Sequence, residues 1–417
     1  MTNKSKNQKE SNLKVGEYIR ESQKIVEQKE EEVNIEIPQQ AEFFKTPVRF
    51  GNIPVDKLPL GCDEKEQYRK IYPKISLPFQ VVERISFGHK DLEPNQLICG
   101  DNLHIMRALP SNSIDLIYID PPFFSGRNYN VVFGDQNEVR SFTDICEGGM
   151  PGYLTWLNAR LLEMKRLLKP TGSIYVHLDW HASHYVKVEM DKIFGYENFR
   201  NEIVWYYGER QLPGAKKYNS KHDVILYYTK TPEYKFNMQF KKYSGGYLDN
   251  FFKFGYCEKC DVEQEWNQEG KCKKCSSPLI RFRKREKSNT YPEGRQYFNE
   301  NQGIAMDTVW SDIPGTHSAK IRMERIGYPT QKPEALLDRI IKTSSNPGDI
   351  VADFFCGGGT TPAVAQKLGR RWIACDISKI AISVTRDRLL RVVLGENKMK
   401  TKKRIGESKN GMQLMES

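Results

Sequence analysis

The sequence predicts an α/β fold in which a mostly parallel β-sheet is covered by helices on both faces. Two observations predict it: short apolar runs recur along the chain, several of them closing on an acidic residue, and segments with helical periodicity alternate with them. The length of 417 residues allows two or three domains, or one domain with large additions. We expect the second arrangement, because a different kind of segment interrupts the alternation.

The expected strands are short apolar runs, each followed by a polar or glycine-rich turn. They are Gln96–Gly100, Ile114–Ile119, Ser173–Leu178, Asp349–Ala352 and Arg371–Cys375, and the clearest expected helices are Tyr153–Leu168 and Glu334–Ser344. Ligands of such sheets bind beyond the carboxyl ends of the strands. The aspartates at those ends are therefore the first candidate site residues: Asp101, Asp120, Asp353 and Asp376.

The composition excludes two classes of protein. With 38% hydrophobic and 28% charged residues and no apolar run of membrane-spanning length, the chain is predicted to be neither disordered nor membrane-bound. The amino-terminal stretch lacks the apolar core of a secretory signal, so we expect a cytoplasmic protein with reduced cysteines. The net charge of +11 favours a polyanionic partner.

Three segments depart from the alternating pattern. Residues 1–45 and 396–417 are charged and poor in core residues, so both are predicted to be flexible tails, the second of them basic. The segment from Trp205 to Glu300 has 20 aromatic, 19 basic and 12 acidic residues. We therefore predict one catalytic domain in two halves, residues 46–204 and 306–395, around an insertion at residues 205–305.

The first motif, Asp120-Pro121-Pro122-Phe123, follows an expected strand. An exocyclic amine on a nucleobase is a poor nucleophile, and a carboxylate with a neighbouring backbone carbonyl can accept its two hydrogens. Prolines stiffen such a loop, and an aromatic ring can stack on a base that has been flipped out of the duplex. The motif alone is short and carries little specificity.

The second motif is a glycine turn, Asp353-Phe-Phe-Cys-Gly357-Gly-Gly359-Thr-Thr, between a strand and a helix. Glycines there let a ligand approach the backbone closely, but Pro362 stands where a dinucleotide site needs a third glycine or alanine. Asp376 ends the next strand, where a carboxylate can hold a ribose diol. The pattern indicates an adenosine-containing cofactor without a pyrophosphate, for which S-adenosylmethionine is the natural candidate.

With both motifs, the chain resembles the amino-methylating DNA methyltransferases in which the catalytic motif precedes the cofactor motif, the beta arrangement that type III modification subunits share. The resemblance runs from Ile98 to His177 and resumes from Tyr328 to Asp376. It implies the Rossmann-like fold of S-adenosylmethionine-dependent methyltransferases, circularly ordered around an inserted target-recognition region. Phe354 and Gly358 depart from the residues usual in the family, which bears on the shape of the loop.

The resemblance also implies a role for each matching position. Asp120 and the Pro121 carbonyl would bind the target amine, with Phe123 stacked on the base. Residues implied to bind the cofactor are Asp101 at the adenine, Asp376 at the ribose, Asp353 at the methionine amino group, Thr330 and Lys332 near its carboxylate, and Phe355, Gly357 and Gly359 along the loop.

Within the insertion, Cys257-x2-Cys260 and Cys272-x2-Cys275 have the spacing of a closed tetrahedral site for structural zinc. The alternative is four reduced surface cysteines. A basic cluster, Arg281, Arg283, Lys284 and Arg285, is a hypothesis for phosphate contacts. His177, His181 and His184 are not expected to converge on a metal, and Asp179 is expected to cap the helix that follows it.

The implied activity is site-specific methyl transfer to adenine N6 in duplex DNA, by base flipping and direct in-line transfer, as the modification component of a restriction-modification system. Cytosine N4 or RNA remain open as substrates, as does a catalytically silent nucleic-acid-binding homologue. Cytosine-C5 chemistry fits poorly, because none of the cysteines follows a proline. The expected partners are duplex DNA, a separate restriction subunit and a second copy of the chain, with no membrane.

Overall fold

The computed structural model describes residues 34–36, 42–44, 79–86, 95–122, 149–208, 216, 218–243, 245–298, 303–315, 318, 321, 324–328 and 330–395. Contacts divide the chain into two compact units, one made of Met1–Phe236 with Val309–Ser417 and the other of Asn237–Thr308. None of the helices in the described part is long and apolar enough to cross a membrane. The predicted tail at residues 396–417 lies outside the described residues.

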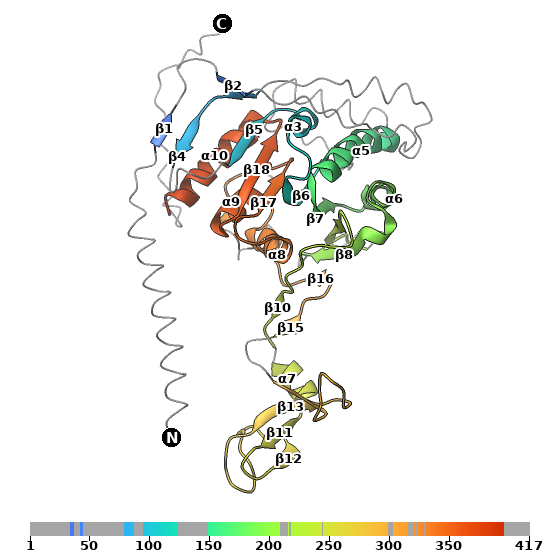
Figure 1. Cartoon of the computed structure of the whole chain (residues 1–417), viewed down its shortest axis with the longest axis vertical. Helices are drawn as coiled ribbons and strands as arrows, with labels where there is room; N and C mark the ends of the chain where they lie inside the picture. Colours follow the sequence, from blue (N-terminus) through green and yellow to red (C-terminus); the bar gives the residue numbers. More distant parts are fainter. Residues whose placement is uncertain are drawn as a thin grey trace. The chain divides into compact units, whose positions relative to one another are not determined.

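The first unit is built on an eight-stranded sheet with the order β16-β8-β9-β7-β6-β17-β18-β5 (Figure 1). All five predicted strands belong to it. Its strands are β5 (Gln96–Cys99), β6 (Ile114–Ile119), β7 (Leu168–Leu178), β8 (Phe199–Tyr206), β9 (His222–Thr229), β16 (Val309–Trp310), β17 (Ile350–Asp353) and β18 (Arg371–Asp376).

The sheet is mixed, because β9 runs antiparallel to both of its neighbours while the remaining strand pairs are parallel. The strand of the first motif, β6, lies beside the strand of the glycine motif, β17, with Leu116 opposite Val351. These strands are far apart in the sequence, so the fold itself brings the two motifs to neighbouring positions at the carboxyl edge.

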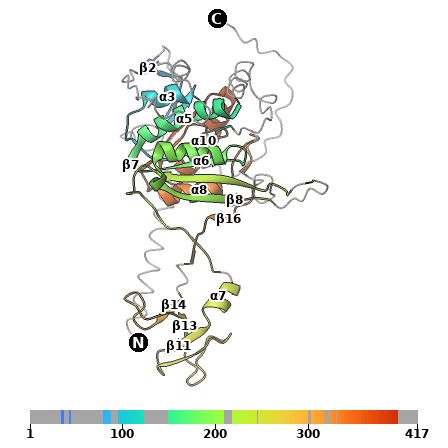
Figure 2. The same ribbon diagram turned by 90° about the vertical axis from the view of Figure 1, so that its right-hand side faces the viewer.

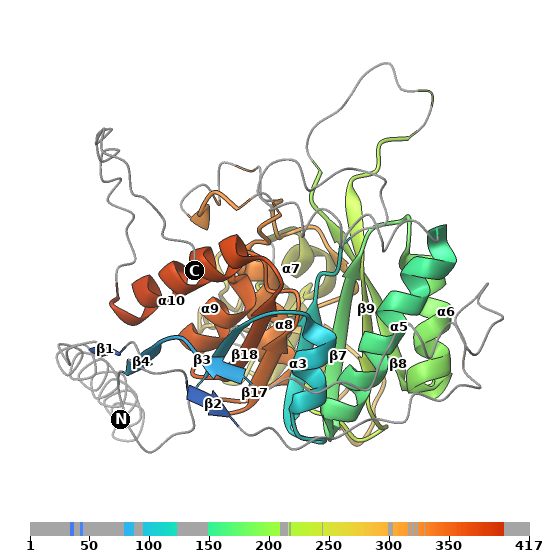
Figure 3. The same ribbon diagram turned by 90° about the horizontal axis from the view of Figure 1, so that it is seen from above.

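In the part of the chain that the structure describes, three helices cover each face of the sheet. Alternate residues of β6 are buried in two separate clusters: Ile117 and Ile119 face α3, α5 and α6, while Leu116 and Tyr118 face α8, α9 and α10. Figure 2 shows α6 and α8 on opposite sides of β8, and Figure 3 shows the same layers from above. The helices are α3 (Asn102–Ala108), α5 (Gly149–Leu167), α6 (Ser183–Phe194), α8 (Glu334–Ser344), α9 (Thr360–Lys367) and α10 (Lys379–Val393).

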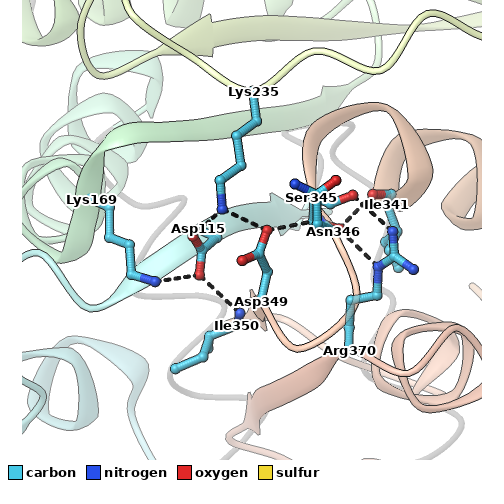
Figure 4. Close-up of polar contacts among 9 residues, drawn as sticks. All are labelled: Asp115, Lys169, Lys235, Ile341, Ser345, Asn346, Asp349, Ile350 and Arg370. Atoms are coloured by element: carbon cyan, nitrogen blue, oxygen red, sulfur yellow. Dashed lines mark hydrogen bonds and ion pairs between the residues drawn. The ribbon is translucent and has the colours of Figure 1, made fainter.

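An ion network around the buried Asp115 ties the amino ends of β6 and β17 together (Figure 4). The Asp115 carboxylate accepts from Lys169 at 2.7 Å, from Lys235 at 2.9 Å and from the Ile350 amide at 3.0 Å. Lys235 also pairs with Asp349 at 2.7 Å. Because Lys235 lies just before Asn237, the network fixes the point at which the chain leaves the main sheet.

The insertion begins later than the sequence predicts. The expected boundary at residue 205 falls inside β8, and the second unit starts only at Asn237. The aromatic residues between these positions belong to the main core: Trp205, Tyr227 and Tyr228 are buried under the helices of the sheet. The aromatic residues of this segment therefore belong to two different cores. Composition alone does not show which residues belong to which core.

The second unit, Asn237–Thr308, contains a four-stranded antiparallel sheet of order β12-β11-β13-β14. Phe252 and Phe282 are its buried aromatic residues. Its elements are β10 (Phe240–Lys241), α7 (Gly245–Phe251), β11 (Phe254–Cys257), β12 (Val262–Glu265), β13 (Ile280–Lys284), β14 (Arg295–Tyr297) and β15 (Ile304–Ala305), and β10 pairs with β15.

The amino-terminal segment predicted to be a flexible tail contains two short strands. β1 (Asn34–Glu36) pairs antiparallel with β4 (Arg84–Ser86), and β2 (Glu42–Phe44) pairs with β3 (Phe79–Val81). Strands of three residues have little sequence pattern of their own, so only pairing with a distant segment distinguishes them from coil.

Candidate active site

Asp120 follows the last residue of β6 at the carboxyl edge of the sheet. One of its carboxylate oxygens, Oδ2, forms a short ion pair with the ammonium of Lys332. The other oxygen, Oδ1, is buried and accepts no hydrogen bond from the described residues. A buried acceptor of this kind is costly to leave unpaired, which makes it a candidate acceptor for a ligand hydrogen.

The structure describes two of the other three residues of the first motif. Pro121 is buried and Pro122 is half-buried, whereas Phe123 lies outside the described residues. Lys332 and Thr330 come from the segment before α8. Thr330 is exposed, and the Lys332 carbonyl accepts a hydrogen bond from the hydroxyl of Thr360 at 3.1 Å.

The glycine loop between β17 and α9 is held from behind by α10. Gly359 has φ +70°, and a Cβ there would come within 2.5 Å of the Thr385 side chain. The hydroxyl of Thr385 donates to the Gly357 carbonyl at 2.9 Å, and Arg388 donates to the Gly358 carbonyl at 3.0 Å. The loop therefore requires glycine at residue 359 for both backbone conformation and space.

Asp353 ends β17 directly before this loop. Its carboxylate is buried and accepts from the Phe355 amide at 3.0 Å and from the Thr361 hydroxyl at 2.5 Å. Burial is the main cause that raises its pKa to about 7, and the negative charges of Asp120 and Asp376 add to it. The loop thus has an excess of negative charge, which a positively charged ligand group would relieve.

Asp376 ends β18, the neighbouring strand. Its Oδ2 accepts from the Gly357 amide at 2.9 Å, and its Oδ1 accepts from the Ser378 amide at 2.9 Å. These bonds fix the orientation of the carboxylate that the sequence predicts to hold the ribose hydroxyls.

Asp101 contributes to the structure in a way that the sequence did not indicate. Its Oδ1 caps α3 by accepting from the Leu103 amide at 2.7 Å, and both oxygens accept from Arg160. Arg160 in turn lies over the Trp156 ring at 4.2 Å, and Trp156 contacts Phe355 with ring centroids 5.6 Å apart. Asp101 therefore anchors an aromatic pair beside the glycine loop.

A buried polar chain beside Asp120 was missed at the level of the sequence. The Tyr118 hydroxyl lies 2.9 Å from Nδ1 of His177, and Nε2 of His177 lies 3.0 Å from Asp223, which also accepts from the Tyr207 hydroxyl at 2.9 Å. Because a carboxylate only accepts, Nε2 donates to Asp223, and in the neutral imidazole Nδ1 then accepts from Tyr118. Recognising residues 222–229 as a strand of the main sheet would have placed Asp223 at this edge.

Charges around Asp223 keep it ionised. Burial alone would raise the pKa of this carboxyl, but the hydrogen bonds from His177 and Tyr207 and the nearby charge of Lys332 outweigh burial and lower it. The hydroxyl pKa of Tyr118 is raised well above its usual value, by burial first and then by the charges of Asp120, Asp353 and Asp223. Tyr118 therefore stays a hydrogen-bond donor.

Another histidine at this edge, His181, pairs with Asp179. Asp179 accepts from the backbone amide of His181 at 3.0 Å and lies 2.6 Å from its Nδ1. The residue that caps α6 is Ala182, without a side-chain hydrogen bond, so the prediction that Asp179 caps this helix is wrong. Asp179 instead holds the turn before it, because a short side chain bonds the amide two residues ahead.

In the second unit, the four predicted cysteines come together. The sulfur atoms of Cys257, Cys260, Cys272 and Cys275 all lie within 4.8 Å of one another. Cys257 and Cys272 are buried, while Cys260 and Cys275 are half-buried. Four thiolates about 2.3 Å from a zinc ion lie about 3.8 Å apart, so the cluster has nearly the dimensions of a zinc tetrahedron.

The predicted basic cluster lies on β13 and just beyond it, and its members have partners within the unit. Arg281 pairs with Asp249 at 2.8 Å, while Arg283 and Arg285 both donate to the Gln296 side chain at 2.7 and 3.1 Å. Lys284 is 62% exposed and lies 3.9 Å from Glu263. Part of the positive charge is thus already compensated by neighbouring groups.

Comparison with known proteins identifies a family that the chain matches. A model of the DNA methylase family matches residues 114–387, which include the first motif, the glycine loop and Asp376. The DNA adenine methyltransferase YhdJ of Escherichia coli is 30% identical over 308 residues, covering 74% of this chain and 85% of that protein. Type II methyltransferase M.HpaI of Haemophilus parainfluenzae is 29% identical over 295 residues, covering 70% and 74%.

The solved structures that match the chain have lower sequence identity to it. A DNA modification methylase from Thermus thermophilus, in complex with S-adenosyl-L-methionine, is 19% identical with a TM-score of 0.40, covering 72% of this chain and 94% of that one. The cytosine-N4-specific PvuII DNA methyltransferase is 17% identical with a TM-score of 0.42, with the same coverage. The match of the family model, which spans more than half of the sequence, and the similarity to YhdJ confirm the predicted relationship: the chain belongs to the N6/N4 family of DNA methylases.

Proposed function

We propose that this protein transfers a methyl group from S-adenosylmethionine to N6 of adenine in duplex DNA. The observation that carries the proposal is the placement of Asp120 and the glycine loop at the carboxyl ends of two adjacent strands, β6 and β17, in a chain of the DNA methylase family. YhdJ is itself a DNA adenine methyltransferase. An aspartate rather than a serine at position 120 favours adenine over cytosine N4.

The cofactor proposal has its support in the charges of the loop. S-adenosylmethionine carries an α-ammonium group, and Asp353, with a pKa raised to about 7, offers it a buried carboxylate. Asp376 would hold the ribose hydroxyls, and Phe355, Gly357 and Gly359 would line the cofactor. Thr330 and Lys332 would lie toward its carboxylate, and Asp101 toward its adenine.

In the proposed reaction, Asp120 and the Pro121 carbonyl accept the two amine hydrogens, and Phe123 stacks on the base. The cofactor supplies an electrophilic methyl group on a sulfonium. The carbon–nitrogen bond forms as the carbon–sulfur bond breaks, and the nitrogen then releases one proton by way of Asp120 to solvent. Pro122 stiffens the loop so that the acceptors keep their positions.

We also propose that Cys257, Cys260, Cys272 and Cys275 hold one structural zinc ion in a ribbon-like unit. The donor set fits, because four sulfur ligands within 4.8 Å of one another can close a tetrahedron. All four ligand positions are then protein thiolates, so the ion has no open position for chemistry. It would stabilise a unit whose apolar core is small.

The insertion is the proposed target-recognition region, with Arg281, Arg283, Lys284 and Arg285 contacting phosphates. M.HpaI and M.BglII are type II methyltransferases, and we propose that this chain likewise serves as a modification component, working in the cytoplasm with any restriction activity on a separate subunit. We also propose that two copies of the chain form a homodimer.

The experiment that tests the function is detection of modified bases in DNA from cells that express the protein. We expect N6-methyladenine at one recurring sequence, and its loss in Asp120→Ala with cofactor binding retained. Digestion of the DNA to nucleosides separates the alternatives, because cytosine-N4 specificity would yield N4-methylcytosine. Unmethylated DNA together with methylated RNA would move the substrate to RNA, and no methylation of either would support a silent homologue.

A further inference from the structure

We propose that Arg160, in the second half of α5, is a positioning residue for the cofactor site. It holds Asp101, the proposed partner of the adenine, and through Asn102 it also holds the backbone of the glycine loop. The inference rests on the proposed function and deepens it, because it concerns how the site selects the adenine of its cofactor. Neither motif contains Arg160, and the resemblance assigns it no role.

The guanidinium of Arg160 is buried, with 4% of the residue exposed, and it donates to three different residues. Nε donates to the side-chain oxygen of Asn102 at 2.6 Å, and Nη1 donates to the Trp156 carbonyl at 3.0 Å. Nη2 donates to both oxygens of Asp101, at 3.1 and 2.9 Å. Because a guanidinium presents its donors in one rigid plane, these bonds fix the positions of the acceptors relative to one another.

Asn102 connects this arrangement to the glycine loop. It is the first residue of α3 and is 7% exposed. Its side-chain oxygen accepts from Arg160, and its side-chain nitrogen donates to the Phe354 carbonyl at 2.8 Å. The Arg160 donor needs an oxygen and the Phe354 carbonyl needs a donor, so the amide has only one favourable orientation. Arg160 thereby helps to fix the backbone that follows Asp353.

An aromatic contact makes a second connection to the same loop. The guanidinium of Arg160 lies 4.2 Å from the centroid of the Trp156 ring. The ring of Trp156 in turn contacts Phe355, with centroids 5.6 Å apart. Phe355 is one of the residues proposed to line the cofactor. Arg160 is therefore linked to two successive loop residues, to Phe354 by hydrogen bonds and to Phe355 by ring contacts.

Asp101 is the member of this arrangement that a ligand can reach. Its side chain is 37% exposed, whereas that of Arg160 is 5% exposed. Besides Arg160, the Leu103 amide holds its Oδ1 at 2.7 Å. Adenine offers an amine hydrogen to such a carboxylate, but hypoxanthine has a carbonyl oxygen in place of the amine, and two acceptors repel. A carboxylate that is held in place cannot turn away from the wrong base, so Arg160 strengthens the preference for adenine.

Binding calorimetry on the full chain tests this role without relying on activity. The two ligands are S-adenosylhomocysteine and S-inosylhomocysteine, which differ in the purine. We expect the wild type to prefer the adenosine compound at least about tenfold. In Arg160→Lys, one ammonium replaces the planar donor set. The affinity for S-adenosylhomocysteine should fall about tenfold, and the preference for it should fall at least about threefold.

The matched control is Arg370→Lys. Arg370 is also buried, and it donates to the Ser345 and Leu368 carbonyls at 2.8 and 2.7 Å, but it lies at the amino end of β18, away from the site. Urea unfolding is measured for both variants. The control should keep the wild-type affinities and preference whatever its stability. An unchanged affinity in Arg160→Lys, or an equal loss for both ligands, would overturn the proposal.

A second variant tests the connection to the loop and serves if Arg160→Lys does not fold. Asn102→Ala leaves Asp101 with its arginine but frees the Phe354 carbonyl. It should weaken binding of both ligands by the same factor, about fivefold, and keep the preference for adenosine. Unchanged affinities in Asn102→Ala would overturn the proposed connection.

The outcomes separate this inference from the proposed function. A wild type that binds S-adenosylhomocysteine but methylates no DNA would refute the proposed function, and the binding comparison would still decide the role of Arg160. A wild type that binds both ligands equally would overturn the inference and leave methylation of DNA untouched.

Discussion

Replacing the buried carboxyl of Asp353 should change how the stability of the protein depends on pH. Its pKa of about 7 lies well above the model value of 3.8, so the folded protein holds a proton here that the unfolded chain releases. Stability from this group is fully present below the unfolded pKa and is lost as pH rises through about 7. Asp353→Asn cannot ionise, so its stability should lack this dependence.

The magnitude follows from the pKa. At pH 5.5, about 1.5 units below the folded pKa, protonation contributes about 2 kcal/mol relative to pH 8.5, at about 1.36 kcal/mol per unit. Urea unfolding of wild type and variant at the two pH values measures it. Relative to wild type, the unfolding free energy of the variant should rise by about 2 kcal/mol on going from pH 5.5 to pH 8.5. An exposed control such as Asp387→Asn on α10 should show no such change.

S-adenosylhomocysteine carries the same α-ammonium group as the cofactor. Saturating the wild type with it should abolish most of the difference in stability between pH 5.5 and pH 8.5. The ammonium would stabilise the ionised carboxylate, so binding near pH 7 should release a proton, which calorimetry in buffers of different ionisation enthalpy detects. A stability difference between wild type and Asp353→Asn that is the same at both pH values would refute the reasoning.

Three further predictions concern other parts of the structure. Asp115→Asn should lower the unfolding free energy by about 2 kcal/mol, because the buried acceptor loses its charge and Lys169 loses its carboxylate, while Lys235 keeps Asp349; an unchanged urea midpoint would contradict this. Gly359→Ala should weaken S-adenosylhomocysteine binding at least about tenfold in calorimetry, since its Cβ meets Thr385, whereas Gly369→Ala, with the same φ of +70° and open space around it, should bind normally. The purified chain should contain about one zinc ion by elemental analysis, and Cys272→Ser should lose it; a zinc-free wild type would remove the zinc proposal.

Much of the main sheet could be predicted because its strands are buried on both faces. β6 is apolar at nearly every position, and the glycine loop after β17 is recognisable from its residues alone. The boundary of the insertion could not be predicted in the same way. Trp205 and Tyr227 in the main core and Phe282 in the second unit are the same kinds of residue, and only their contacts distinguish them.

The candidate site shows the same division. Asp120, Asp353 and Asp376 were predictable because each ends a strand, and the strand ends of such a sheet meet at one edge. Asp223 was not, because β9 runs in the opposite direction and brings its first residues, rather than its last, to that edge.

The sequence by itself determined five strands of the main sheet, the two motifs, the four clustered cysteines and membership of the DNA methylase family, because each depends on residues close together in the chain or on their fixed order. The tertiary structure alone decided that Lys332 pairs with Asp120, that Asp223 faces His177, and that Asp115 joins Lys235 and Ile350. Asp115 and Ile350 lie 235 positions apart. Contacts across such separations depend on the direction and order of the strands, which local residue patterns do not specify.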